Sequence, residues 1–213
     1  MRRWIPDICP REQEFVEIMK QIRKDLVKIV HGDEREYTAV LFCGSGTISM
    51  DVCLNSLLPA GKKILVINNG AYSSRAAEIC EYYGLPFINL KFPIDERPSL
   101  EQIEQILKEN QDIALVYITH NETGTGILNP IREIGALAHA YGAIFVVDTT
   151  STYAMRPINI KTTILILYGI GTKGFNGNDG NIICGWEKNN NRAIENLSKT
   201  FLLLQFIYAV PLF

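Results

Sequence analysis

Short, unbroken apolar runs that alternate with helix-like segments constrain the fold of this chain more than any other feature. A run of this kind is typical of a β-strand that is buried on both faces, as in a parallel sheet. The runs cover residues 38–42, 63–67, 113–119, 143–148 and 164–167, and residues 87–92 could form a further strand. Strands that alternate with helices over this length predict an α/β fold whose sheet is mostly parallel.

The segments between the runs carry helix signals. Residues 12–30 place apolar side chains at steps of three and four, which predicts an amphipathic helix. Ser99 stands directly before Leu100 and Glu101 and is expected to cap the start of another helix. Further helices are expected after residue 47, over residues 74–83 and over residues 129–141.

Composition narrows the classes of function. The chain is 47% hydrophobic and 21% charged, which is ordinary for a soluble globular protein, and its formal charge of −2 argues against nucleic acid or an anionic membrane as a partner. The five cysteines are scattered, and none has the spacing of a zinc site. We therefore expect reduced thiols in a cytoplasmic protein.

Two residues at expected strand ends can supply complementary chemistry. Asp148 closes the run at 143–148, and Lys173 follows the run at 164–167 within Gly-Thr-Lys-Gly. Ligands of open α/β sheets bind at the carboxyl ends of the strands. A lysine amine there could condense with the aldehyde of pyridoxal phosphate, and a carboxylate could keep the pyridine nitrogen protonated. The alternative for the pair is a helix-capping aspartate and a surface lysine.

Three further segments could contact the same ligand. Residues 44–47 (Gly-Ser-Gly-Thr) lie between a strand and a helix and could bind a phosphate with backbone N–H groups and hydroxyls. Ser49 stands where a dinucleotide motif needs glycine, so a single phosphate fits better. Tyr72 could stack on a flat ring, and Thr123 could bond its phenolic oxygen. Glycine turns before helices, a tyrosine packed under a loop and ordinary turn chemistry are the alternatives.

Taken in order, these motifs resemble the class V aminotransferases of fold type I, and within that family the group of 2-aminoethylphosphonate–pyruvate transaminases. The motifs are Gly44-Ser45-Gly46-Thr47, Asn69-Gly70-Ala71-Tyr72, His120 to Gly126, Val147-Asp148 through Ser151, and Thr172-Lys173, with Pro6 to Phe15 similar to a segment of that group. The resemblance implies a three-layer α/β/α large domain that binds pyridoxal 5'-phosphate. It also implies an amino donor and a 2-oxo acid as substrates, and a homodimer.

The resemblance also assigns roles to residues. Lys173 and Asp148 are the implied catalytic residues. Ser45, Gly46, Thr47, Tyr72, Thr123, Asp148, Ser151, Thr172 and Lys173 are the implied cofactor-binding residues. The threonines at 149, 150 and 152 depart from the family pattern, which has small residues and a second serine there.

We expect residues 1–190 to form the cofactor-binding large domain and residues 191–213 to begin a connection to a carboxy-terminal domain that the chain lacks. The family's Asn-Pro-Gly-Pro start and its substrate-binding arginine are also not in the sequence, so an inactive fragment is expected. An alanine–glyoxylate or serine–pyruvate type of aminotransferase and a non-catalytic cofactor-binding domain remain alternatives. A cysteine desulfurase is disfavoured, because Gly171-Thr172 precede Lys173 where those enzymes resemble Ser-x-His.

Overall fold

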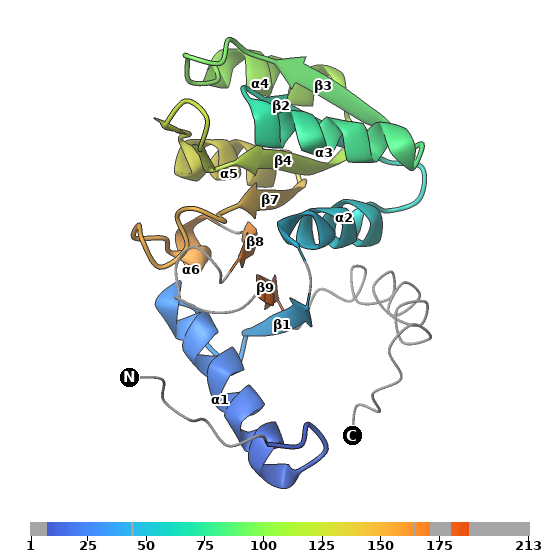
Figure 1. Cartoon of the computed structure of the whole chain (residues 1–213). Coiled ribbons are helices and arrows are strands. Elements are labelled where there is room, and N and C mark those ends of the chain that lie inside the picture. Colours follow the sequence, from blue (N-terminus) through green and yellow to red (C-terminus); the bar gives the residue numbers. More distant parts are fainter. Residues whose placement is uncertain (1–7, 44, 164, 171–179, 188–213) are drawn as a thin grey trace.

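A seven-stranded sheet forms the centre of the computed structural model, which describes residues 8–43, 45–163, 165–170 and 180–187 (Figure 1). The strands follow the spatial order β1-β9-β8-β7-β4-β2-β3. They are β1 (Tyr37–Cys43), β2 (Lys63–Asn68), β3 (Phe87–Lys91), β4 (Ile113–Thr119), β7 (Ile144–Asp148), β8 (Leu165–Ile170) and β9 (Gly180–Glu187). Each apolar run of the sequence is therefore a strand.

Most neighbouring strands run in the same direction. The pairs β2–β3, β2–β4, β4–β7 and β7–β8 are parallel. Strand β9 is antiparallel to both β8 and β1, so β1 points the same way as β8. The carboxyl ends of β1, β2, β4, β7 and β8 consequently lie at one edge of the sheet. The predicted, mostly parallel sheet is confirmed.

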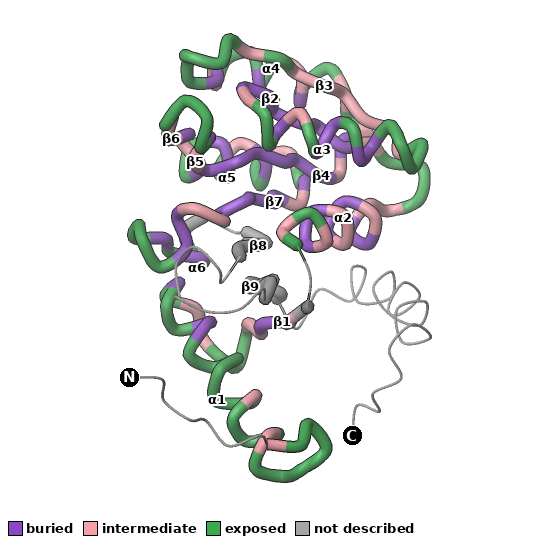
Figure 2. The backbone as a smooth tube through the Cα atoms, viewed as in Figure 1, coloured by how far each residue is buried: buried purple, intermediate pink, exposed green. Residues whose placement is uncertain are grey.

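Helices cover both faces of the sheet and make three layers (Figures 1 and 2). On one face lie α2 (Gly46–Leu57) and α3 (Ala71–Tyr82), whose buried side chains pack with those of β2, β4 and β7. On the other face lie α1 (Gln13–Ile29), α4 (Leu100–Glu109), α5 (Ile131–Ala140) and α6 (Ile160–Thr163). Because β2, β4 and β7 contribute alternate residues to the two clusters, their side chains are buried on both faces.

The sequence patterns predict the long helices to within a few residues; for example, residues 12–30 are expected to be helical and α1 covers Gln13–Ile29. Ser99 caps α4 as predicted, since its hydroxyl accepts the N–H of Gln102 at 3.2 Å. The short hairpin of β5 (Asn121–Glu122) and β6 (Ile127–Leu128) was not predicted, and neither were α6 and β9. No helix in the described part of the chain is both long and apolar enough to cross a bilayer.

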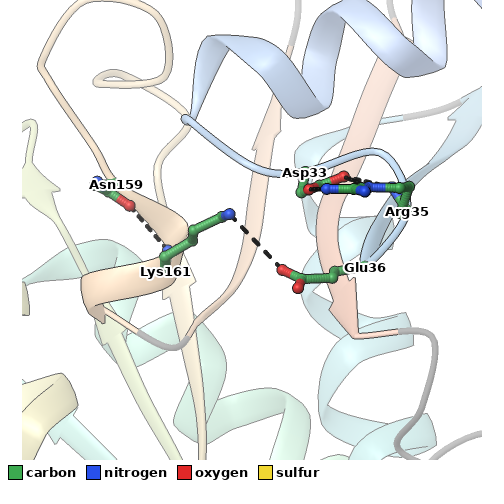
Figure 3. Close-up of polar contacts among 5 residues, drawn as sticks. All are labelled: Asp33, Arg35, Glu36, Asn159 and Lys161. Atoms are coloured by element: carbon green, nitrogen blue, oxygen red, sulfur yellow. Dashed lines mark hydrogen bonds and ion pairs between the residues drawn. The ribbon is translucent and has the colours of Figure 1, made fainter.

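Helix α6 is tied to the end of α1 and the loop that follows it. The N–H of Ile160 donates to the carbonyl of Val30 at 3.0 Å, and Lys161 pairs with Glu36 at 3.8 Å (Figure 3). Beside that pair, Nε and Nη2 of Arg35 donate to Oδ1 and Oδ2 of Asp33, and this two-pronged ion pair holds the pKa of Asp33 well below its usual range. The Lys161–Glu36 pair is exposed, so we assign the main attachment to Ile160, which is buried.

Candidate active site

Asp148 lies at the carboxyl edge of the sheet as the last residue of β7, where the sequence placed it. The residue is 4% exposed, and its Oδ1 accepts the N–H of Thr150 at 2.8 Å. Its carbonyl accepts the N–H of His120 at 2.8 Å, which joins the ends of β4 and β7. Burial, and to a smaller extent the charge of Asp148, raise the pKa of Cys53, so α2 also lies close to this carboxylate. A buried carboxylate thus stands where the parallel strands end.

The start of α2 offers groups that can bind an anion. Ser45 is the N-cap residue, and its side chain makes no capping hydrogen bond to the helix. Ser45 and Thr47 are exposed, and Gly46 is partly exposed. The first N–H groups of a helix have no partner within the helix and favour negative charge. The structure therefore keeps the predicted phosphate residues accessible; Gly44 lies outside the described residues.

Tyr72 occupies a different local structure from the one we predicted. The sequence suggested a helix from residue 74, but α3 begins at Ala71, so Tyr72 lies in its first turn. The residue is 40% exposed, which is compatible with a ring that stacks on a ligand.

Thr123 and Ser151 lie on neighbouring loops at the same edge. Thr123 is exposed in the turn between β5 and β6. Ser151 follows β7, and its hydroxyl accepts a hydrogen bond from the Asn121 side chain at 3.0 Å. Asn121 therefore ties the loop after β7 to the β5–β6 hairpin, a role that the sequence analysis missed.

Glu122 links that hairpin to α3. It is 0% exposed, and its Oε1 accepts the N–H of Tyr72 at 3.5 Å. Burial raises the pKa of Glu122, although the amides of Tyr72 and Ser73 act in the opposite direction. A Cβ atom on Gly70 would collide with the Glu122 side chain, so a larger residue there would displace that side chain. The sequence analysis quoted Glu122 within a motif but gave it no role.

Seven of the nine predicted cofactor-binding residues are thus found at or beside the carboxyl edge of the sheet. They are Ser45, Gly46, Thr47, Tyr72, Thr123, Asp148 and Ser151. Glu122, Asn121 and His120 connect the elements that carry them. The other two, Thr172 and Lys173, lie outside the described residues, as does segment 191–213.

His120 should make the stability of the chain sensitive to acid. Its Nδ1 lies 2.8 Å from the Thr152 hydroxyl, and burial, with the positive charge of Arg156, lowers its pKa to about 4. Histidine in an unfolded chain titrates near 6.5, so the folded state resists protonation. The neutral imidazole of His120 therefore contributes fully to the stability of the fold above about pH 6.5. This contribution is lost as the pH falls through about 4, which lowers the free energy of unfolding by up to about 3 kcal/mol.

Denaturant unfolding measured at several pH values tests this expectation. Carboxyl groups titrate in the same window, so the informative quantity is the difference between the wild-type and His120→Gln profiles. We expect that variant to show a flatter loss of stability between pH 6.5 and 4. The matched control is His139→Gln, which removes an exposed imidazole on α5 and should retain the wild-type slope. Parallel profiles for wild type and His120→Gln would contradict the assignment.

Known proteins resemble this chain in sequence and in fold. The family model described as aminotransferase class-V matches residues 7–183. A bifunctional phosphonoacetaldehyde hydrolase/aminoethylphosphonate transaminase of Clostridioides difficile is 37% identical over 157 residues, which is 74% of this chain and 25% of that protein. A 2-aminoethylphosphonate–pyruvate transaminase of Lysinibacillus sphaericus is 33% identical over 74% of this chain and 43% of its own length. The chain therefore spans less than half the length of these relatives.

Solved structures agree with the fold. Pyridoxamine–pyruvate aminotransferase from Mesorhizobium loti superposes with a TM-score of 0.80 at 20% identity and covers 90% of this chain and 47% of its own. Alanine–glyoxylate aminotransferase from Nostoc sp. superposes with a TM-score of 0.79 at 24% identity, over 91% of this chain and 50% of its own. At 20% and 24% sequence identity, the similarity to these structures shows the fold alone. The family assignment rests on the sequence match over residues 7–183, which is most of the chain. The chain belongs to the class-V aminotransferase family.

Proposed function

We propose that this chain is the cofactor-binding part of a pyridoxal-phosphate-dependent transaminase that moves an amino group from 2-aminoethylphosphonate to pyruvate. The observation that carries the proposal is the buried carboxylate of Asp148 at the end of β7. Relatives that are 33–37% identical and bear the names of such transaminases support the choice of substrates.

The described residues fit the chemical groups of pyridoxal phosphate. Asp148 offers a buried carboxylate, the partner that a protonated ring nitrogen requires. The amides at the start of α2, with the exposed hydroxyls of Ser45 and Thr47, suit the phosphate. The exposed ring of Tyr72 suits stacking, and the exposed hydroxyl of Thr123 suits the phenolic oxygen. The donor set therefore matches each end of the cofactor.

The bound cofactor supplies an electron sink for the carbon that bears the amino group. Asp148 would hold a proton at the ring nitrogen, because a nearby negative charge favours the charged form. Lys173 would anchor the aldehyde and then move a proton at the substrate carbon as a general base. Ser151 and Thr172 would join residues 45–47 around the phosphate, and Tyr72 would fix the plane of the ring. We also propose that the complete protein is a cytoplasmic homodimer that uses an amino donor and a 2-oxo acid.

A cofactor titration of the 213-residue chain tests the proposal. We expect pyridoxal phosphate to produce a visible absorption band, and borohydride to fix the cofactor on the chain. We expect no steady turnover of 2-aminoethylphosphonate with pyruvate, because the substrate's acidic group needs a fixed arginine. Arg132 and Arg156 are exposed, and Arg75 is paired with Glu78 at 2.8 Å. A chain that acquires no visible band would overturn the proposed function, and steady turnover would overturn the expectation of an incomplete substrate site.

A further inference from the structure

Glu122 is buried in a place where a carboxylate is costly. It is 0% exposed, and Oε2 has no hydrogen-bond partner among the described residues. Burial of a carboxyl group with one unsatisfied oxygen destabilises a fold, so such a group calls for an explanation. No step proposed above uses this side chain, so its position needs a separate explanation.

The carboxylate takes the place of a local helix cap. Gly70 is the N-cap residue of α3 and has no side chain to offer the helix. Instead, Glu122 reaches across from β5, and its Oε1 accepts the N–H of Tyr72 at 3.5 Å. The carboxylate also lies close enough to the amide of Ser73 for that amide to lower its pKa. A negative charge is favourable at a helix start, so this contact fixes where α3 begins.

The hydrogen bond between Glu122 and Tyr72 connects the two residues that are predicted to contact the cofactor ring, Tyr72 and Thr123. Tyr72 is bonded through its amide to Glu122, and Thr123 is the next residue after Glu122 in the chain. Tyr72 is 40% exposed and Thr123 is exposed, so packing against neighbouring side chains holds each residue on only part of its surface. Their relative position therefore depends on the backbone. A second bond, from the Ser73 hydroxyl to the Thr119 hydroxyl at 3.3 Å, ties α3 to β4 but does not reach the turn that carries Thr123.

We propose that Glu122 is a positioning residue that sets the spacing between Tyr72 and Thr123. This spacing determines how the cofactor ring fits between Tyr72, which stacks on its face, and Thr123, which bonds its phenolic oxygen. The inference rests on the proposed function, because both contacts are assigned to pyridoxal phosphate. Gly70 belongs to the same device, since a side chain there would displace the carboxylate.

The test compares cofactor affinity and the circular dichroism of the bound cofactor among variants. Glu122→Ala should weaken binding about 10- to 100-fold and reduce the dichroic band, which is the size of effect seen when residues that orient the direct ligands of a metal site are replaced. Glu122→Gln keeps an acceptor oxygen and nearly the same shape, so it should restore affinity to within about threefold of wild type. Gly70→Ala should reproduce the loss seen in Glu122→Ala without changing any predicted contact residue.

Two controls separate positioning from a loss of stability. Ser99→Ala removes the cap of α4, on the opposite face of the sheet, and should leave affinity and dichroism at wild-type values. In a chain that already carries Tyr72→Ala, the Glu122→Ala substitution should weaken cofactor binding by less than about a further twofold, because the effects of residues that act as a unit are not additive. Additive losses in the double variant, or wild-type affinity in Glu122→Ala, would overturn the inference. A wild-type chain that does not bind the cofactor would instead overturn the proposed function, and the inference with it.

Discussion

We expect the Lys173→Ala substitution to abolish the covalent attachment of pyridoxal phosphate to this chain. The lysine follows an apolar run that is now seen as β8, and the carboxyl ends of parallel strands meet at the edge that holds Asp148. Only an amine can form the linkage that borohydride fixes. The variant should therefore bind the cofactor reversibly, without the visible band of the linked form.

Mass spectrometry after borohydride treatment measures this outcome directly. The matched control is Lys91→Ala, because Lys91 is an exposed lysine at the carboxyl end of the parallel strand β3. That control should become labelled as fully as the wild type. A Lys173→Ala chain that is still labelled would show that another lysine carries the cofactor.

Asp148→Asn should leave the cofactor bound but strip the proton from its ring nitrogen. The amide has nearly the same shape and retains the oxygen that accepts the N–H of Thr150, so the end of β7 should keep its structure. What disappears is the negative charge beside the nitrogen. A facing charge of this kind shifts a pKa by about 1–3 units, so the pKa of the ring nitrogen should fall by that amount.

Nitrogen NMR of pyridoxal phosphate labelled at the ring nitrogen reports the protonation state in the bound complex. We expect a protonated signal at neutral pH in the wild type and a neutral one in Asp148→Asn. Asp51→Asn removes a carboxylate on α2 that is bonded to Asn55 and Tyr83, and should keep the wild-type signal. An unchanged signal in Asp148→Asn would mean that another group holds the proton.

Local sequence patterns carried most of the architecture. Strands β2, β4 and β7 coincide with apolar runs, because both faces of these strands are buried between helices. Asp148 could be placed at the end of β7 because it is the first charged residue after the run at 143–147. Ser99 could be identified as a cap because its partner, Gln102, lies three residues away.

The missed features depend on partners that are distant in the chain. The sequence predicts the start of α3 three residues too late, because Gly70 offers no cap and Glu122, from β5, supplies one. Strand β9 pairs with β1, which lies far away in sequence, so no local pattern could reveal its antiparallel direction. The roles of Thr172 and Lys173 stay predictions.

The sequence by itself determined the α/β fold, the mostly parallel sheet and the position of Asp148 at a strand end, because burial and capping leave periodic and short-range patterns in the chain. Only the tertiary structure decided that Tyr72 belongs to a helix and that Glu122 joins it to Thr123. That contact comes from the packing of two segments fifty residues apart, as measured from Tyr72 to Glu122. A close approach of this kind depends on how the elements pack, which spacing in the sequence does not encode.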